Sequence, residues 1–287
     1  MSEQQIDPAA QKAGHLRHYS SAASGWMKWW AINGRALQSI GDRMCELAHI
    51  RPGQRVLDIA TGIGEPALTA AQRVGPSGYV LATDIAPEML DFGKSRAAGM
   101  GLGNLEFRQM DAEAMDLPDA SFDAILCRFG LMFLPGLDAD LRAIWRRLIP
   151  GGWFAAAVWS TADKVPSSGI AASAVKRALQ LPPPPPGTLD PYALSDPVAL
   201  KDRFARAGFV ELHVETTYAH FEWPSPNAYV EFAQDMLAIV RTNLTNLPPE
   251  RQFQVLDAIR ETAAKYQVPN GAVQVDSEAF LVAGRRV

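Results

Sequence analysis

Two glycines and two aspartates in the first half of the chain are spaced as in a nucleoside-binding site. Gly62 and Gly64 stand in the stretch Asp-Ile-Ala-Thr-Gly-Ile-Gly, directly after Arg-Val-Leu at residues 55–57. Glycine lets backbone N–H groups in such a turn approach a ligand closely, because it has no Cβ to obstruct them. Gly64 is followed by Glu-Pro-Ala, so the spacing departs from Gly-x-Gly-x-x-Gly. The turn therefore favours a compact zwitterion over a pyrophosphate.

The two aspartates follow the next two apolar runs. Asp84 comes twenty residues after Gly64, and Asp111 lies in Gln-Met-Asp-Ala-Glu. A carboxylate at the first position can accept both hydroxyls of a ribose, and one at the second can accept from an adenine amino group. A single acid after a strand is commonly an N-cap or a solvated turn residue. Three features at three successive strand ends instead converge on one crevice at the carboxyl edge of a sheet, which favours nucleoside binding.

The elements that must position these residues alternate between β-rich runs and helical patterns. Strands are expected at residues 55–59, 79–83, 105–108, 122–127 and 153–159. Helices are expected between them at residues 67–74, 87–98 and 137–148. Repeated strand–helix–strand units predict right-handed crossovers and a parallel sheet.

The pattern loosens after residue 160. The run Pro182–Pro186 predicts an extended surface spacer, because proline cannot join a sheet. A helix at 198–207, a sixth strand at 209–217, two or three helices within 227–265 and a last strand at 279–283 follow. We expect an α/β, Rossmann-like fold whose seven-stranded, mostly parallel sheet has helices on both faces. Residues 1–50 would form an N-terminal helical segment, and residues 51–287 one domain with a helical insertion at about 221–270 before the last strand.

Composition excludes several classes of protein. The formal charge is −4, from 27 basic and 31 acidic residues, which argues against a nucleic-acid binder. The two cysteines, Cys45 and Cys127, exclude a disulfide framework or a Cys-rich zinc site, and no paired His, Asp and Glu support another metal. The longest apolar run, residues 153–159, is far below the ~20 residues of a membrane span, and the N-terminus lacks an apolar signal region. We expect a cytoplasmic protein with a small-molecule partner. A monomer and a homodimer both remain open.

Residues 51–160 resemble class I S-adenosylmethionine-dependent methyltransferases, most closely the ubiquinone/menaquinone-biosynthesis C-methyltransferase type. The resemblance rests on four features: the stretch Asp-Ile-Ala-Thr-Gly-Ile-Gly that contains Gly62 and Gly64, Asp84, Asp111-Ala112, and Leu-Ile-Pro-Gly-Gly at 148–152. It implies S-adenosylmethionine as the cofactor and makes the N-terminal segment a lid. The implied cofactor-binding residues are Asp58, Ala60, Gly62, Gly64, Asp84, Ile85, Met89, Asp111, Ala112 and Arg128.

The resemblance also implies a role for each of these residues. The Asp58 motif would face the methionine moiety, and the Arg128 backbone would close that end. Asp84 would hold the ribose, while residues 85 and 89 would line the adenine and residues 111–112 would bind its edge. The family usually has glycine where Ala60 stands, a departure that the quinone branch tolerates.

A second departure concerns the acceptor. In the quinone enzymes strand four runs into Phe-Gly-Leu or Phe-Gly-Ile followed by Arg-Asn, whereas here Met132 stands at the arginine position. This favours an apolar acceptor wall and weighs against a quinone acceptor. We expect methyl transfer to a carbon or oxygen of a small, apolar, aromatic metabolite. The expected acceptor-binding residues are Trp26, Phe129, Met132, Phe133 and Trp159.

Two residues are candidates for a catalytic role. His220, expected just after the sixth strand, could act as a general base near neutral pH, although a lone histidine there is more often a surface residue. Tyr19 in the N-terminal segment is the second candidate. Trp26, Trp29 and Trp30 are expected on one helix face, where core packing and acceptor contact both remain open. The alternative to an enzyme is a cofactor-binding, non-catalytic relative, and the intact glycines and aspartates favour the enzyme.

Overall fold

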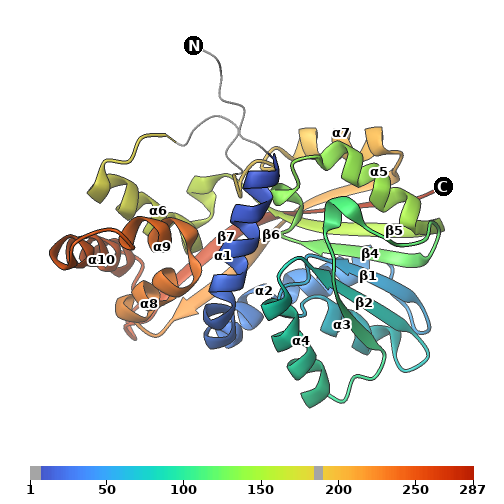
Figure 1. Cartoon of the computed structure of the whole chain (residues 1–287), viewed down its shortest axis with the longest axis horizontal. Helices are drawn as coiled ribbons and strands as arrows, with labels where there is room; N and C mark the ends of the chain where they lie inside the picture. Colours follow the sequence, from blue (N-terminus) through green and yellow to red (C-terminus); the bar gives the residue numbers. More distant parts are fainter. Residues whose placement is uncertain (1–7, 184–189) are drawn as a thin grey trace, which may run out of the picture. The chain divides into compact units, whose positions relative to one another are not determined.

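The seven strands form one sheet in a computed structural model that describes residues 8–183 and 190–287 (Figure 1). Their order is β3-β2-β1-β4-β5-β7-β6. Strands β3, β2, β1, β4 and β5 pair in parallel, and β7 pairs antiparallel to β5. The strands are β1 (Arg55–Ile59), β2 (Tyr79–Asp84), β3 (Leu105–Gln109), β4 (Phe122–Arg128), β5 (Leu148–Trp159), β6 (Val210–Trp223) and β7 (Val273–Arg285). The expected seven-stranded, mostly parallel sheet is confirmed.

The chain divides into two compact units, which we describe separately. The sheet unit comprises Gln38–Ser160, Leu189–Thr217 and Ala279–Val287. The helical unit comprises Met1–Leu37, Thr161–Thr188 and Tyr218–Glu278. These boundaries differ from the division at residue 50 expected from the sequence, and the expected lid stays a prediction.

Helices of the sheet unit lie on both faces of its strands. Figure 1 shows α5 and α7 on one side and α3 and α4 on the other. These helices are α3 (Ala67–Val74), α4 (Pro87–Gly99), α5 (Leu137–Arg147) and α7 (Pro197–Ala207). Acidic Asp138 in the first turn of α5 and basic Arg147 in its last turn both suit the helix dipole. Asp196 caps the N-terminus of α7, because its Oδ1 accepts from the N–H of Val198 at 2.9 Å.

Apolar residues of the strands and of α5 and α7 form the core of this unit. Strand β4 is buried along most of its length, as expected for a parallel strand covered on both faces. The rings of Phe154, Phe204 and Phe209 pack with centroids 5.3 to 5.7 Å apart. Burial of such rings stabilises the fold by ~25 cal/mol per Å² of apolar area. This core holds the carboxyl ends of the strands in place.

The helical unit contains five helices among its described residues, and helix α2 (Trp30–Leu47) begins in it and continues into the sheet unit. The five are α1 (Pro8–Lys28), α6 (Pro166–Leu179), α8 (Pro226–Met236), α9 (Ala238–Leu244) and α10 (Pro249–Ala264). Its core contains Trp223 and Tyr229, whose rings meet edge to face at 4.8 Å. The Tyr229 hydroxyl donates to the carbonyl of Ser167 and accepts from the N–H of Ala171, which ties α8 to the start of α6.

Several elements differ from the expected boundaries, and strand β5 begins at Leu148 instead of residue 153. Strand β6 continues to Trp223, six residues beyond the expected end, because Ala219, Phe221 and Trp223 are buried in alternation with exposed residues. Strand β7 begins at Val273 instead of residue 279. Helix α6 occupies part of the stretch expected to lack regular structure. Residues 184–186 of the predicted proline spacer lie outside the described residues.

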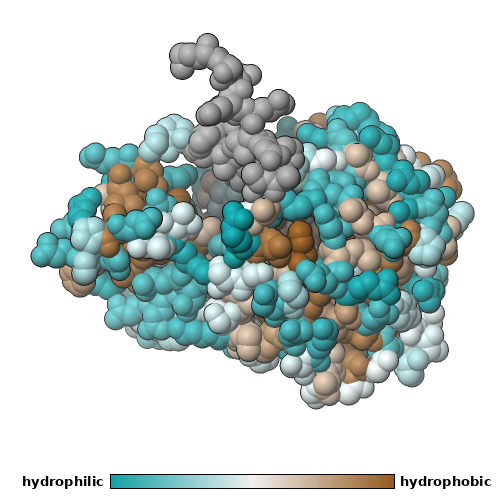
Figure 2. Space-filling view, viewed as in Figure 1, coloured by the Kyte–Doolittle hydropathy of each residue, from teal (hydrophilic) through white to brown (hydrophobic). Residues whose placement is uncertain are grey.

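Large apolar side chains that reach the surface are spread along the sequence. Phe253 is 70% exposed and Val198 is 68% exposed, and they belong to different units. Figure 2 shows that hydrophilic residues cover most of the visible face, with apolar residues between them. Isolated exposed apolar residues are normal for a folded protein. Within residues 8–183 and 190–287, no helix has both the length and the apolar character that a membrane crossing requires.

Candidate active site

Asp58 organises the glycine turn at the end of β1. Its side chain is fully buried, and its Oδ2 accepts from the Thr61 hydroxyl at 2.6 Å and from the N–H of Ala67 at 3.0 Å. These bonds join β1, the turn and the first residue of α3. The other oxygen, Oδ1, is buried without a hydrogen-bond partner. An unsatisfied buried carboxylate oxygen is costly, so it suits a site that receives a donor from a ligand.

Burial also changes the ionisation of Asp58. Desolvation raises the pKa of Asp58 to about 7, against the hydrogen bond from Thr61 and the charge of Arg128. Near neutral pH the side chain is therefore divided between its neutral and charged forms. A cation placed beside Oδ1 would favour the charged form.

The turn itself uses left-handed backbone conformations. Gly62 and Gly64 have φ of 57° and 96°, which glycine adopts without steric cost. Ala60 has φ of 56°, a conformation that costs a residue with a Cβ of order 1–3 kcal/mol. A glycine at position 60 would adopt this backbone conformation without that cost.

Asp84, at the end of β2, binds the same turn. Its Oδ2 accepts from the N–H of Gly62 at 2.8 Å, and its Oδ1 accepts from the N–H of Ala86 at 2.9 Å. Burial raises the pKa of Asp84, and these two N–H groups oppose the rise. Each carboxylate oxygen can accept a further hydrogen bond, so a diol can still bind.

The residues assigned to the adenine lie on the two segments after β2 and β3. Met89 on α4 is 3% exposed, and its Cε would lie 3.5 Å from a Cβ built at Gly62. Ile85 is partly exposed. Asp111 caps the 3₁₀ turn η1 (Ala112–Ala114) by accepting from the N–H of Glu113 at 3.0 Å. Asp111 is thus an N-cap, and the turn that it caps begins at Ala112.

Arg128 at the end of β4 contributes its side chain as well as its backbone. Its Nη1 lies 3.7 Å from a Cβ built at Gly41 in α2, so the guanidinium reaches the part of α2 that belongs to the sheet unit. Desolvation lowers the pKa of Arg128, and the carboxylates of Glu65 and Asp58 oppose that shift. Sequence alone assigned a role only to the Arg128 backbone.

An aromatic pair stands at the carboxyl ends of β4 and β5. The rings of Phe129 and Trp159 stack with centroids 3.9 Å apart and planes 9° apart. Phe129 has φ of 58°, a strained conformation for a bulky residue. A Cβ at Gly130 would lie 2.7 Å from the Cβ of Ala60, so this segment packs directly against the glycine turn. The pair therefore lies beside the proposed cofactor site.

The other two predicted wall residues belong to η2 (Leu131–Phe133). Phe133 is partly buried and packs against the core. Met132 is 3% exposed and lies within the core cluster of the sheet unit. The side chain at 132 thus fills the core and is not presented at the surface.

The candidates outside the sheet unit lie on α1 and β6. The ring of Tyr19 meets His18 edge to face at 5.1 Å, and Trp26 is partly exposed. The three tryptophans do not share one continuous helix face, because α1 ends at Lys28 and α2 begins at Trp30. Trp29, between them, is 8% exposed, and its Nε1 donates to Asp235 at 2.8 Å.

His220 lies within β6, because the strand continues past the expected end at residue 217. Its Nδ1 is 2.6 Å from Oδ1 of Asp276, and 69% of its side chain is exposed. Tyr218, two residues earlier, donates to Oε2 of Glu278 at 3.3 Å. His220 is therefore a surface histidine beside a carboxylate.

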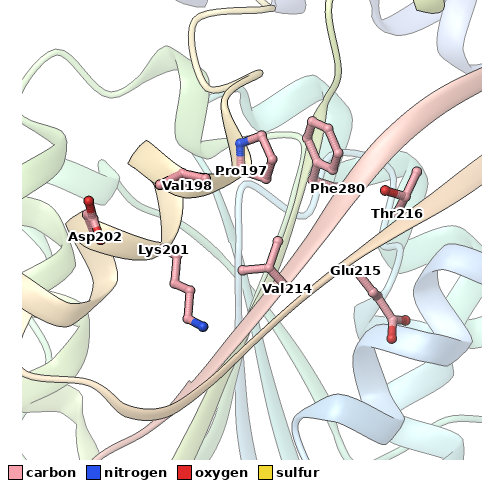
Figure 3. A pocket seen from close by; sticks show the side chains of 8 residues that line it. All are labelled: Pro197, Val198, Lys201, Asp202, Val214, Glu215, Thr216 and Phe280. Carbon is pink, nitrogen blue, oxygen red and sulfur yellow. The ribbon is translucent and has the colours of Figure 1, made fainter.

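The sheet unit also contains a hollow of about 500 Å³ between α7 and β6, away from the predicted site residues (Figure 3). Its walls include Val198, Val214 and Phe280, and the Lys201 side chain extends toward Val214. Glu215, also at this hollow, is paired with Arg43 at 2.7 Å. None of the predicted cofactor or acceptor residues lines it.

Arg96 also binds the glycine turn and pairs with Glu65, and neither residue was among the predicted site residues. Glu65 follows the turn, and Arg96 lies on α4, 31 residues away. The only sequence signal was an acid directly after Gly64, because the arginine that pairs with it is placed by the packing of α4.

Comparison with known proteins agrees with this geometry. Residues 56–152 match the methyltransferase domain family. The chain is 44% identical over 108 residues to the ubiquinone/menaquinone biosynthesis C-methyltransferase UbiE of Pseudomonas putida strain F1. That match covers 37% of this chain and 42% of the relative, so the chain spans about two fifths of the relative's length.

Solved structures share the fold at low identity. The YcgJ protein of Bacillus subtilis has a TM-score of 0.53 and 21% identity, covering 87% of this chain and 98% of that one. Phosphoethanolamine N-methyltransferase 2 of Haemonchus contortus, solved with S-adenosyl-L-methionine, has a TM-score of 0.53 and 18% identity, covering 87% and 53%. In its glycine turn, strand-end aspartates and strand order, the chain is similar to class I S-adenosylmethionine-dependent methyltransferases.

Proposed function

We propose that this protein transfers a methyl group from S-adenosylmethionine to a carbon or oxygen of a small, apolar, aromatic acceptor. The observation that carries the acceptor class is the Phe129–Trp159 stack beside the glycine turn. The orphaned Oδ1 of Asp58 and the left-handed turn at Gly62 and Gly64 fit the cofactor. Both features belong to the sheet unit.

The residues of the chain would mainly bind, orient and exclude water. When bound, S-adenosylmethionine supplies a methyl group on a sulfonium that is already activated for displacement. Asp84 would hold the ribose hydroxyls, and Asp58 would face the amino group of the methionine moiety. Arg128 and Glu65 carry opposite charges near Asp58 and limit the net charge of the site. Fixed geometry of this kind lowers the barrier of an in-line displacement.

The aromatic pair favours a flat acceptor ring. Stacked or edge-to-face rings contribute about 0.5–1.5 kcal/mol beyond their buried area. A charged, freely soluble acceptor such as an amino acid would be poorly solvated against such a wall. The two partly buried rings therefore suit an aromatic or polycyclic metabolite with a hydroxyl or a nucleophilic ring carbon.

A quinol-type ring is one member of this class. The relative from P. putida is a quinone-pathway C-methyltransferase by its name. Because Met132 packs in the core, its difference from arginine reflects the packing of η2 and is not a missing charge at the acceptor. Quinols therefore belong in any acceptor panel.

A general base is needed only when the acceptor is a neutral hydroxyl or an unactivated carbon. His220 and Tyr19 stay predicted candidates for that role. Phe133 would extend the acceptor wall of the sheet unit, and acceptor contact by Trp26 stays a prediction. The contrasting function is a cofactor-binding protein without catalysis. That alternative predicts cofactor binding with no turnover on any acceptor.

Incubation of the protein with S-adenosylmethionine and a panel of phenols, indoles and quinols tests the proposal. The expected result is an acceptor that gains the mass of one CH₂, with S-adenosylhomocysteine formed in equal amount. A preference for glycine-like amines would contradict the acceptor class. Binding of the cofactor without product on the whole panel would favour the non-catalytic alternative.

A further inference from the structure

Helix α4 contacts the glycine turn directly. A Cβ built at Gly64 would lie 3.4 Å from the Cα of Gly93. A Cβ at Gly93 would lie 2.5 Å from Cε1 of Phe107 and 3.3 Å from the carbonyl carbon of Ile63. Glycine at position 93 is therefore required for α4 to approach the turn this closely.

One helical turn after Gly93, Arg96 binds the turn in two places. Its Nη1 donates to the carbonyl oxygen of Ile63 at 2.9 Å, and its Nη2 donates to Oε1 of Glu65 at 3.0 Å. Only 15% of the Arg96 side chain and 13% of the Glu65 side chain are exposed. A partly buried, charge-assisted pair of this kind is stronger than a surface ion pair.

Glu65 is held from its other side as well. Its Oε2 accepts from the Thr69 hydroxyl at 3.1 Å, and the same hydroxyl accepts from Gln38 Nε2 at 3.2 Å. Gln38 lies on α2 and Thr69 on α3. The carboxylate that pairs with Arg96 is thus fixed by hydrogen bonds from a second element, which favours one position of the guanidinium.

This arrangement adds a side-chain restraint to a turn that is also held by the bonds from Gly62 N–H to Asp84 and from Gly64 N–H to the Thr61 carbonyl. Ile63 lies between two glycines, and glycine can adopt several backbone conformations at little cost. The Ile63 carbonyl shares its peptide plane with the Gly64 N–H, so the bond from Arg96 helps to fix the orientation of that plane. The same helix carries Met89, whose Cε would lie 3.5 Å from a Cβ built at Gly62.

We propose that Arg96 is a positioning residue, which holds the Gly62–Gly64 turn in the conformation that receives the methionine end of the cofactor, with Glu65 as its counter-charge. This inference rests on the proposed function. Arg96 would not touch the reacting atoms. Its effect would be largest for ligands that carry the amino-acid moiety and small for ligands that carry only the adenosine.

The test compares two ligands that differ in that moiety. S-Adenosylhomocysteine carries the amino acid, whereas 5′-methylthioadenosine keeps the adenosine and the sulfur without it. Arg96→Gln should raise the Kd for S-adenosylhomocysteine about tenfold, which corresponds to ~1.4 kcal/mol. The Kd for 5′-methylthioadenosine should change by less than about twofold on the same reasoning.

Three further variants sharpen the test. Arg96→Lys keeps the charge but loses the fork, so its effect should be intermediate. Glu65→Gln should have a smaller effect than Arg96→Gln, because the bond from Arg96 to the Ile63 carbonyl remains. Lys94→Gln is the matched control, since Lys94 lies on the same helix in an exposed pair with Asp91. It should leave both Kd values unchanged.

The outcomes separate the two proposals. Equal weakening of both ligands by Arg96→Gln would show a general structural role and overturn the inference, as would unchanged affinity for S-adenosylhomocysteine. Failure of the wild-type protein to bind S-adenosylhomocysteine would contradict the proposed function instead. If Arg96→Gln does not fold, the ratio of the two Kd values in Arg96→Lys and Glu65→Gln decides the question in the same way.

Discussion

The carboxylate of Asp84 accepts a hydrogen bond from the backbone N–H of Gly62 at 2.8 Å, so the residue proposed to bind the ribose also fixes the glycine turn. Two neighbouring strands, β1 and β2, are joined at their carboxyl ends by this contact. Loss of the Asp84 side chain would therefore affect both ends of the cofactor.

Asp84→Ala should weaken binding of S-adenosylmethionine by at least about tenfold, because it removes two charge-assisted hydrogen bonds of ~1.5–3 kcal/mol each. Titration calorimetry measures the change. Asp91→Ala, at an exposed position of α4, is the control and should bind normally. Unchanged affinity in Asp84→Ala would remove Asp84 from the cofactor site.

The raised pKa of Asp58 predicts a dependence of stability on pH. The native state binds the Asp58 proton up to about pH 7, whereas the unfolded chain releases it near the ordinary value of 3.8. The native state thus binds more protons between these values, and the contribution of Asp58 to the free energy of unfolding falls as pH rises through this window.

Wild-type protein should therefore lose stability relative to Asp58→Asn between pH 4 and pH 7 and show a constant difference above pH 8. Urea unfolding of both proteins across this range measures the difference. A difference that does not change with pH would show that Asp58 titrates normally in the folded protein.

Trp159→Leu should lower kcat/KM for an aromatic acceptor about three- to tenfold, since a ring pair contributes ~0.5–1.5 kcal/mol. The Kd for S-adenosylhomocysteine should stay the same. Trp153→Leu is the matched control, because Trp153 lies at the other end of the β5–β7 pairing. Equal loss of activity in both variants would mean that the effect comes from the strand and not from the acceptor wall.

Met132→Arg should destabilise the protein by several kcal/mol, because the side chain at 132 is 3% exposed and lies in an apolar core. Thermal unfolding measures the loss. Met132→Leu nearly conserves volume and should cost less than about 1.5 kcal/mol. An arginine variant as stable as wild type would place residue 132 outside the core.

Gly25→Ala should destabilise the contact between α1 and α8 by about 1–3 kcal/mol, because its Cβ would lie 2.7 Å from the backbone oxygen of Asp235. Gly34→Ala is the control. Its Cβ would meet only Cε3 of Trp30 at 3.9 Å, so alanine should stabilise α2 by about 0.5–1 kcal/mol. Chemical unfolding of the two variants should show effects of opposite sign.

Much of the sheet unit could be predicted from the sequence because its signals are local. The apolar runs at β1, β2 and β4, the glycines at 62 and 64 and the aspartate at 84 each follow from residue types a few positions apart. A parallel sheet then brings strand ends to one edge regardless of the details of packing. The parallel arrangement of these strands and the position of the glycine turn therefore needed no tertiary information.

Tertiary packing decided the contacts between distant residues. The pair of Glu65 with Arg96 depends on the close approach of α4 to the turn, and the stack of Phe129 on Trp159 depends on the left-handed backbone at 129. The burial of Met132 could likewise not be predicted from the sequence, because an apolar residue after a strand can face a ligand or the core. Residue types determine the local backbone conformation. The elements that pack against each other determine which partner a side chain meets.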